Sequence, residues 1–142
     1  MFRHRLAIAA VLIAPLCQAG PLCDRLAEHC QQSARFEQLK DVPYGPHEHQ
    51  RFDVYLPKPH PTGAPIILPA HGGSWRHGDK AADSVVKHKV RHWVGQGVIL
   101  VSTNYRLLPE TAPLEQANDV ARALAAVQRQ ADTWGAMRAG GC

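Results

Sequence analysis

Two uninterrupted apolar runs constrain the fold of this chain more than any other feature. Residues 66–68 and 98–101 are continuous stretches of β-rich residues with proline or glycine nearby, a pattern typical of strands covered on both faces in a parallel sheet. Residues 83–97 lie between them and place apolar side chains on one helical stripe before a closing glycine. The order strand, helix, strand predicts a βαβ unit with a right-handed crossover. The apolar side chains of the stripe are Val85, Val86, Val90, Trp93 and Val94.

The flanking segments extend this unit in both directions. Residues 114–134 carry apolar side chains at helical spacing, which predicts a second amphipathic helix that returns across the sheet. A third parallel strand is expected after it, where the sequence reads GAMRAGGC. Upstream, residues 35–45 and 50–59 alternate partly between apolar and polar side chains, so we predict an edge hairpin with one face in water. The second helix has Ala117, Val120, Ala121, Leu124, Val127, Ala131 and Trp134 on its apolar stripe, with Asp119 and Arg122 elsewhere.

The first 19 residues have the three-part layout of a secretory signal. A basic start with Arg3 and Arg5 is followed by an apolar stretch over residues 6–16 and by small residues around Ala19. The stretch is shorter than the roughly 20 residues of a membrane-spanning helix. We therefore expect residues 1–19 to be removed on export, to the periplasm or out of the cell, with a buried N-terminal helix as the alternative.

Residues 20–35 are polar and are expected to form a loosely attached N-terminal extension. Because an exported protein leaves the reducing cytosol, Cys23 and Cys30 can form a short-loop disulfide. The remaining chain, residues 36–142, is then a single domain.

Composition and charge exclude several classes of protein. The chain is 45% apolar and 20% charged, as in ordinary globular domains. Its net charge is +4, and its basic residues are scattered among acidic ones with no basic run between aromatics, so no nucleic-acid partner is expected. Of the nine histidines, His88 and His92 have helical ligand spacing, but no cysteine or carboxylate completes a set. We predict solvated histidines, no metal and no cofactor.

The sequence His71-Gly72-Gly73-Ser74-Trp75 follows the first buried strand. Open α/β sheets bind ligands at the carboxyl ends of their strands, and glycines there let the backbone turn sharply with its N–H groups exposed. Such donors can stabilise the oxyanion that forms in acyl transfer. The alternative is a strand-ending turn without chemistry.

Three motifs in order give this chain a family resemblance. HGGSW is followed by Gly78-Asp79-Lys80 and then by VSTNYRLLPE, and together with the preceding hairpin this set resembles the N-terminal half of α/β-hydrolases of the esterase and lipase type. It is most similar to feruloyl-esterase-like and carboxylesterase-like members, over roughly residues 36–135. The resemblance implies an incomplete α/β-hydrolase fold, made of a hairpin and a βαβα unit. It also implies that the completed enzyme acts on small-molecule carboxylic esters.

The resemblance also implies roles for individual residues. Gly73 and Ser74, with Gly72 supporting the turn, match the N–H donors of the family's oxyanion hole. Four further residues are expected to support the loop. His71 braces it and Trp75 adjoins it. Tyr105 is expected to be buried, and Arg106 to tie the loop to an acidic partner such as Glu110. Asp79 is expected to cap or salt-bridge locally after the turn.

The nucleophile motif of the family, G-x-S-x-G, is missing from the sequence. The sequence GGSWR has Arg76 where the second glycine belongs, so no catalytic residue is assigned to this chain. We expect residues 36–142 to be the N-terminal part of a hydrolase domain, truncated before the nucleophile elbow and inactive alone. The alternative is a short, exported, non-catalytic protein that uses the half-fold for binding.

Overall fold

A computed structural model describes residues 21, 24–26 and 35–137. The predicted signal, residues 1–19, and the predicted Cys23–Cys30 disulfide lie outside the described residues. The strands are β1 (Phe36–Pro43), β2 (Arg51–Pro57), β3 (Ile66–Ile67) and β4 (Ile99–Thr103). The helices are α2 (Asp83–Trp93) and α3 (Pro113–Gln130), followed by the 3-10 turns η1 (Val94–Gln96) and η2 (Ala131–Trp134), respectively.

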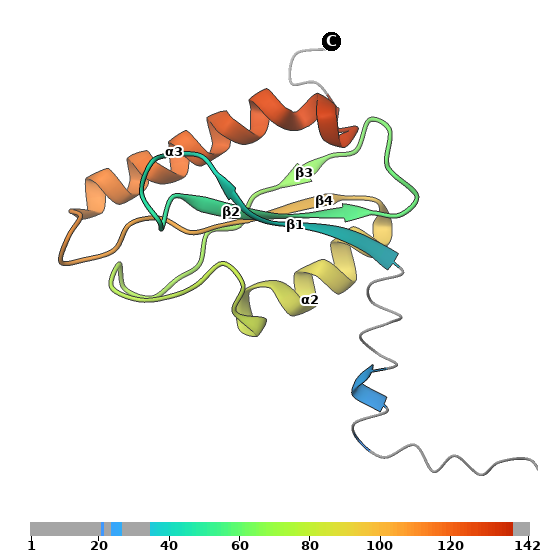
Figure 1. The fold of residues 1–142 in the computed structure, drawn as a ribbon, viewed down its shortest axis with the longest axis horizontal. Helices are drawn as coiled ribbons and strands as arrows, with labels where there is room; N and C mark the ends of the chain where they lie inside the picture. The colour runs from blue at the N-terminus through green and yellow to red at the C-terminus, as the bar shows by residue number, and fades with distance from the viewer. Residues whose placement is uncertain (1–20, 22–23, 27–34, 138–142) are drawn as a thin grey trace, which may run out of the picture.

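The four strands form one mixed sheet in the order β1-β2-β4-β3. β1 pairs with β2 and β2 with β4 antiparallel, whereas β3 and β4 are parallel. Helix α2 lies on one side of the sheet and α3 on the other (Figure 1). The predicted hairpin, the βαβ unit and the second helix are therefore confirmed, and so is the α/β fold class.

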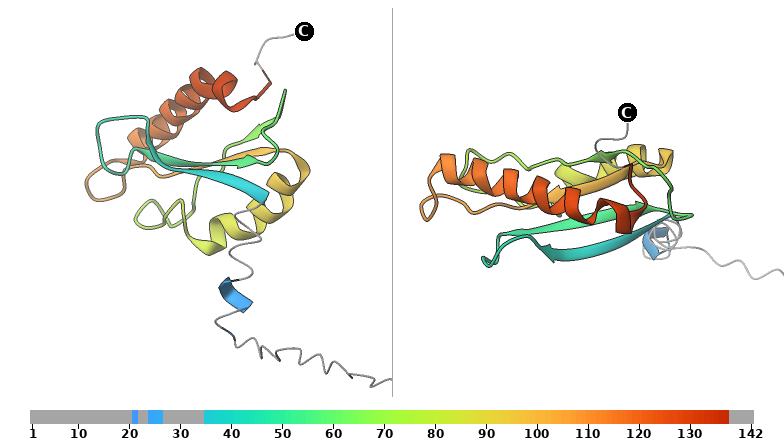
Figure 2. Two further views of the ribbon diagram at one scale, coloured as in Figure 1. Left: turned by 45° about the vertical axis from the view of Figure 1, so that its right-hand side comes forward. Right: turned by 90° about the horizontal axis from the view of Figure 1, so that it is seen from above.

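Successive side chains of the central strands β2 and β4 belong alternately to two separate hydrophobic cores. On β2, Phe52 and Val54 pack on the side of α3, while Tyr55 packs on the side of α2. On β4, Val101 and Leu100 divide in the same way. The sheet is thus the middle layer of three, which Figure 2 shows from two further directions.

The hairpin was expected to have one wet face, and for β2 this expectation is wrong. Every β2 residue after Arg51 is buried, because β2 lies between β1 and β4 and has a core on each side. The polar residue Asp53 in its alternating pattern is 1% exposed. It pairs with the Lys80 ammonium at 2.7 Å, so the alternation marks a buried ion pair and not contact with water.

The parallel edge of the sheet is less covered than its sequence predicts. Both residues of β3 are only half-buried, and β4 is the one strand that pairs with β3 among the described residues. Its other edge carries one parallel bridge, between Ala64 and Ala136, in which Met137 N–H donates to Ala64 O at 2.9 Å. This bridge stands where the third parallel strand was expected to begin.

Helix α2 and the turn η1 that follows it bury a narrower stripe than predicted. Val86, Val90 and Val94 are buried at intervals of four residues, but Trp93 is 38% exposed and makes an edge contact with the His92 ring. Its position at the margin of the stripe leaves the indole outside the core. Among the described helices, none is long and apolar enough to cross a membrane.

Candidate functional site

The loop over residues 71–78 leaves the sheet at the carboxyl end of β3. Just before it, Ala70 forms a parallel bridge with Thr103, and Thr103 N–H donates to Pro69 O at 3.2 Å. The loop therefore starts beside the end of β4, at the edge where open α/β sheets bind ligands.

Three consecutive residues of this loop have positive φ angles: Gly73 at 129°, Ser74 at 55° and Trp75 at 65°. The turn is closed by the N–H groups of Arg76 and His77, which both donate to Gly73 O. A Cβ at position 73 would lie 1.7 Å from His77 O, so the turn requires glycine there. Left-handed backbone at two non-glycine residues is costly and concentrates at functional sites.

The N–H groups of Gly72, Gly73 and Ser74 donate to no acceptor within the described part of the chain. Gly72 and Ser74 are exposed, and Gly73 is half-buried. The loop thus leaves three consecutive backbone N–H groups without an acceptor among the described residues, near the carboxyl end of β3.

Below the loop, His71 is buried and stacks on Tyr105, with ring centroids 4.4 Å apart. The Tyr105 hydroxyl donates to His71 O at 2.8 Å, and burial raises the pKa of Tyr105. His71 Nδ1 lies 2.8 Å from Gly72 O, which fits a ring that donates through Nδ1–H. The Nε2 atom is buried without a partner among the described residues. These contacts fix His71, the first residue of the loop, against Tyr105.

The carbonyl of Trp75 is held by two donors, the N–H of Leu108 at 2.8 Å and Nε2 of Gln116 at 3.2 Å. Gln116 Nε2 also donates to Thr111 O at 2.7 Å, and its side chain is fully buried. Sequence reasoning missed Gln116. The apolar stripe predicted for α3 did not include position 116, whereas in the structure Gln116 and Asp119 are both fully buried.

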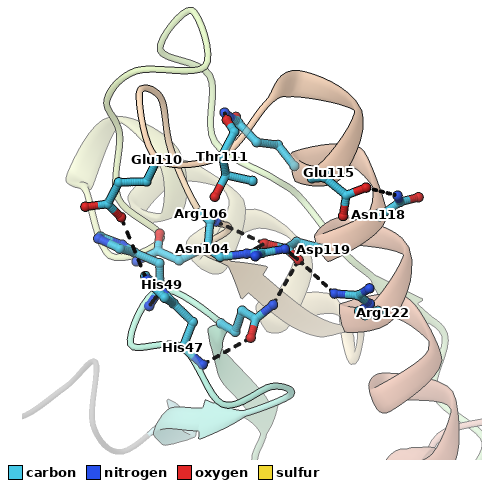
Figure 3. Close-up of polar contacts among 12 residues, drawn as sticks. His47, His49, Asn104, Arg106, Glu110, Thr111, Glu115, Asn118, Asp119 and Arg122 are labelled. Atoms are coloured by element: carbon cyan, nitrogen blue, oxygen red, sulfur yellow. Dashed lines mark hydrogen bonds and ion pairs between the residues drawn. The ribbon is translucent and has the colours of Figure 1, made fainter.

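Arg106 pairs with Asp119 and not with Glu110, which corrects the partner expected from the sequence. Its Nε and Nη2 atoms each lie 2.7 Å from an Asp119 oxygen. Figure 3 draws this pair. Glu110 instead lies 3.9 Å from His47 and is 73% exposed. Asp119 was also placed on the polar side of α3, but it is fully buried, since Arg106 and Gln50 supply its hydrogen bonds.

The Gly78-Asp79-Lys80 motif anchors the end of the loop. Asp79 accepts hydrogen bonds from the Ala81 N–H at 2.7 Å and from Asn104 Nδ2 at 3.0 Å. Burial opposes the charge of Asp79, but these hydrogen bonds outweigh burial and lower its pKa. A Cβ at Gly78 would lie 2.1 Å from His71 Nδ1, so glycine lets the two ends of the loop meet.

Lys80 lies beneath the hairpin with its side chain almost fully buried. Its ammonium is 2.8 Å from Asp41 and 2.7 Å from Asp53. Burial would lower the pKa of Lys80, but the hydrogen bonds that its ammonium donates to both carboxylates raise it overall. A hollow of about 830 Å³ opens here, between the hairpin and α2. No residue of the HGGSW loop lines it, so it is separate from the candidate site.

The described residues contain no group of three or more His, Cys, Asp or Glu side chains that could hold a metal ion. His88 Nδ1 lies 3.0 Å from an Arg91 nitrogen, and His92 Nε2 lies 3.2 Å from Gln96. The two histidines of α2 therefore have local polar neighbours on the helix surface.

Solved esterases contain the same arrangement of sheet and helices. Esterase B from Lactobacillus rhamnosis matches with a TM-score of 0.62 and 21% identity, over 80% of this chain and 39% of that one. A thermostable carboxylesterase cloned from a metagenomic library matches with a TM-score of 0.55 and 26% identity, over 79% of this chain and 40% of that one. The fold is therefore part of an α/β-hydrolase fold of the esterase type.

The BD-FAE family model matches residues 52–138, and the chain belongs to this family. Esterase LipC of Mycobacterium tuberculosis is 29% identical over 119 residues, which are 83% of this chain and 28% of LipC. Kynurenine formamidase of Danio rerio is 29% identical over 92 residues, 65% of this chain and 30% of the relative. The chain thus spans about 30% of the length of the curated relatives it matches.

Proposed function

We propose that this chain carries the oxyanion-binding part of an active site that hydrolyses carboxylic esters, with the remaining catalytic groups on a segment that follows Met137. The observation that carries the proposal is the row of unpaired N–H groups at Gly72, Gly73 and Ser74, at the carboxyl end of a parallel strand. When an ester is attacked, its carbonyl oxygen becomes an oxyanion. Preorganised donors aimed at that oxygen are worth ~3 kcal/mol each.

In this proposal Ser74 contributes its backbone N–H and not a nucleophilic hydroxyl. Within the described residues, no hydrogen bond joins a serine hydroxyl to a histidine, the contact that activates such a nucleophile. The Ser102 hydroxyl donates to Lys80 O at 2.7 Å and is fully buried. The 142-residue chain alone is therefore proposed to be inactive towards esters.

Coding DNA beyond Cys142 provides the first test. We expect a frame that encodes an apolar strand followed by G-x-S-x-G. The extended protein should hydrolyse p-nitrophenyl butyrate. Replacing the serine of that motif by alanine should abolish turnover, whereas Ser74→Gly should preserve kcat because position 74 keeps its N–H.

The opposite results would overturn the proposal. Efficient turnover by the 142-residue chain that Ser74→Ala abolishes would make Ser74 a nucleophile. The second reading, a non-catalytic binding protein, would be supported if no such frame exists and the 142-residue chain unfolds cooperatively and binds a ligand specifically.

Export is proposed from the signal-like residues 1–19 alone. N-terminal sequencing of protein recovered from outside the cytoplasm should begin at Gly20. Recovery of the intact N-terminus from the cytoplasm would contradict this proposal.

A further inference from the structure

A second hollow, of about 350 Å³, opens beside the Arg106–Asp119 pair. It is built from three elements that are far apart in the sequence: the β1–β2 turn, the segment after β4, and α3 (Figure 3). Its lining residues are Pro46, His47, Gln50, Arg106 and Arg122, and we call it the arginine hollow. No carboxylate is among these residues.

Two guanidinium groups, those of Arg106 and Arg122, contact one buried carboxylate beside this hollow. Asp119 accepts two hydrogen bonds of 2.7 Å from Arg106 and one of 2.9 Å from Gln50. Its remaining cationic neighbour, Arg122, lies at 3.4 Å and has a side chain that is 57% exposed. The Arg122 guanidinium at the mouth of the hollow therefore shares the Asp119 carboxylate with Arg106 and contacts it only through Nη1, at 3.4 Å.

Several N–H donors around the arginine hollow are unused. Nη1 of Arg106 and both Nε and Nη2 of Arg122 have no acceptor in the described part of the chain. Nε2 of His47 lies 3.9 Å from Glu110, which is beyond hydrogen-bond distance. The other nearby acid, Glu115, accepts a hydrogen bond from Asn118 at 3.3 Å. Glu115 interacts electrostatically with Arg106, but among the described residues neither acid accepts a hydrogen bond from these donors.

The scaffold beneath the donors is rigid. Gln50 is 3% exposed and joins the turn to α3: its Oε1 accepts from the His47 N–H at 3.1 Å and its Nε2 donates to Asp119. Arg106 is fixed by its two contacts with the same carboxylate. Donors that are already fixed lose little conformational entropy when a ligand binds.

We propose that the arginine hollow is a binding site for an oxyanion, the carboxylate or phosphate group of a small molecule. Guanidinium N–H groups match the geometry of both ligands and form short, charge-assisted hydrogen bonds with them. Arg122 supplies exposed donors, and Arg106 and His47 line the hollow with it. The proposal does not depend on ester hydrolysis, since none of these residues belongs to the HGGSW loop.

The test is a titration of the full chain with inorganic phosphate and, separately, with acetate, against chloride at matched ionic strength. Side-chain N–H signals of arginine in NMR spectra report binding. We expect saturable shifts with at least one of the two anions. Saturation by phosphate alone assigns a phosphate ligand, and saturation by acetate assigns a carboxylate ligand.

Arg122→Gln should weaken binding by at least about tenfold, as expected for the loss of a charged hydrogen-bond partner. Arg129→Gln is the matched control, because it removes the same charge from an exposed position on α3 that does not line the hollow. His47→Asn should also weaken binding while keeping an oxygen that can accept the His49 N–H now held by His47 Nδ1. Equal weakening by Arg129→Gln, unchanged binding in both hollow variants, or the absence of saturation with either anion would overturn the proposal.

Discussion

Arg106 donates two hydrogen bonds of 2.7 Å to the buried carboxylate of Asp119. Burial alone would raise the pKa of Asp119, but the hydrogen bonds from Arg106 and Gln50 outweigh it and hold the pKa below its ordinary value. The pair joins the segment after β4 to the middle of α3. It therefore fixes the helix against the part of the chain that carries Tyr105.

Asp119→Asn should destabilise the fold by about 3 kcal/mol, because removal of one partner leaves a partly buried charge without compensation. The free energy of unfolding in urea measures this cost. Glu110→Gln is the control: this exposed side chain should contribute less than ~0.5 kcal/mol. An equal loss in the two variants would contradict the assignment of Asp119 as the partner of Arg106.

The same carboxylate predicts how stability responds to acid. The pKa of Asp119 is lower in the folded chain than the ordinary 3.8, so the unfolded chain takes up a proton first as the pH falls. The stabilisation is complete well above pH 3.8 and is lost as the pH drops through the folded pKa. Urea midpoints between pH 6 and pH 3 should fall less steeply for Asp119→Asn than for wild type. Identical slopes would show that Asp119 does not carry the effect.

Gly73→Ala should lower the stability of the HGGSW turn, whereas Gly72→Ala should not. A Cβ at position 73 meets His77 O at 1.7 Å, but a Cβ at position 72 meets no atom within 4 Å. The positive φ at Gly73 adds strain to the clash, and together they should cost about 2 kcal/mol or more. Thermal unfolding of the two variants makes the comparison. A tolerated Gly73→Ala would mean that the turn is more adaptable than its backbone indicates.

Lys80→Met should destabilise the hairpin by about 3 kcal/mol, because it leaves the buried Asp53 carboxylate without its cation. Lys87→Met is the matched control, since Lys87 is exposed and lies 3.9 Å from an exposed partner, Asp83. Its effect should stay within ~0.5 kcal/mol. Urea denaturation of both variants provides the comparison, and a small effect for Lys80→Met would show that the apolar isostere replaces the ion pair without loss.

The sequence predicted the secondary structure better than the polar contacts. Apolar runs and helical spacing located the βαβ unit and α3, with buried residues such as Ile99 and Val127. The stripe predicted for α3 was only partly right, because Ala117, Ala121 and Leu124 are exposed. Asp53 and Asp119 are as buried as these, but a charged residue in an amphipathic pattern normally indicates a wet face. Only the partner shows otherwise, and Lys80 and Arg106 are brought to them by tertiary folding.

For the candidate site too, the sequence predicted the local motif better than the polar contacts. HGGSW and its position after a buried strand were visible in the sequence. Glu110 was a reasonable partner for Arg106 because it is four residues away along the chain, but the chain extends outwards there and a helix residue takes its place. Trp93 fits the apolar stripe of α2 by spacing alone, yet within the described part of the chain its side chain stays 38% exposed.

Gln116 affects how two segments of the chain move, as well as where they lie. One buried amide group donates to the carbonyls of both Trp75 and Thr111, so the turn after β3 and the entrance to α3 are clamped to each other. A displacement of the first turn of α3 would be transmitted to the peptide groups around Ser74. We expect the two segments to move together. A contact made on the exposed face of α3 should therefore change the positions of the N–H donors of the HGGSW loop.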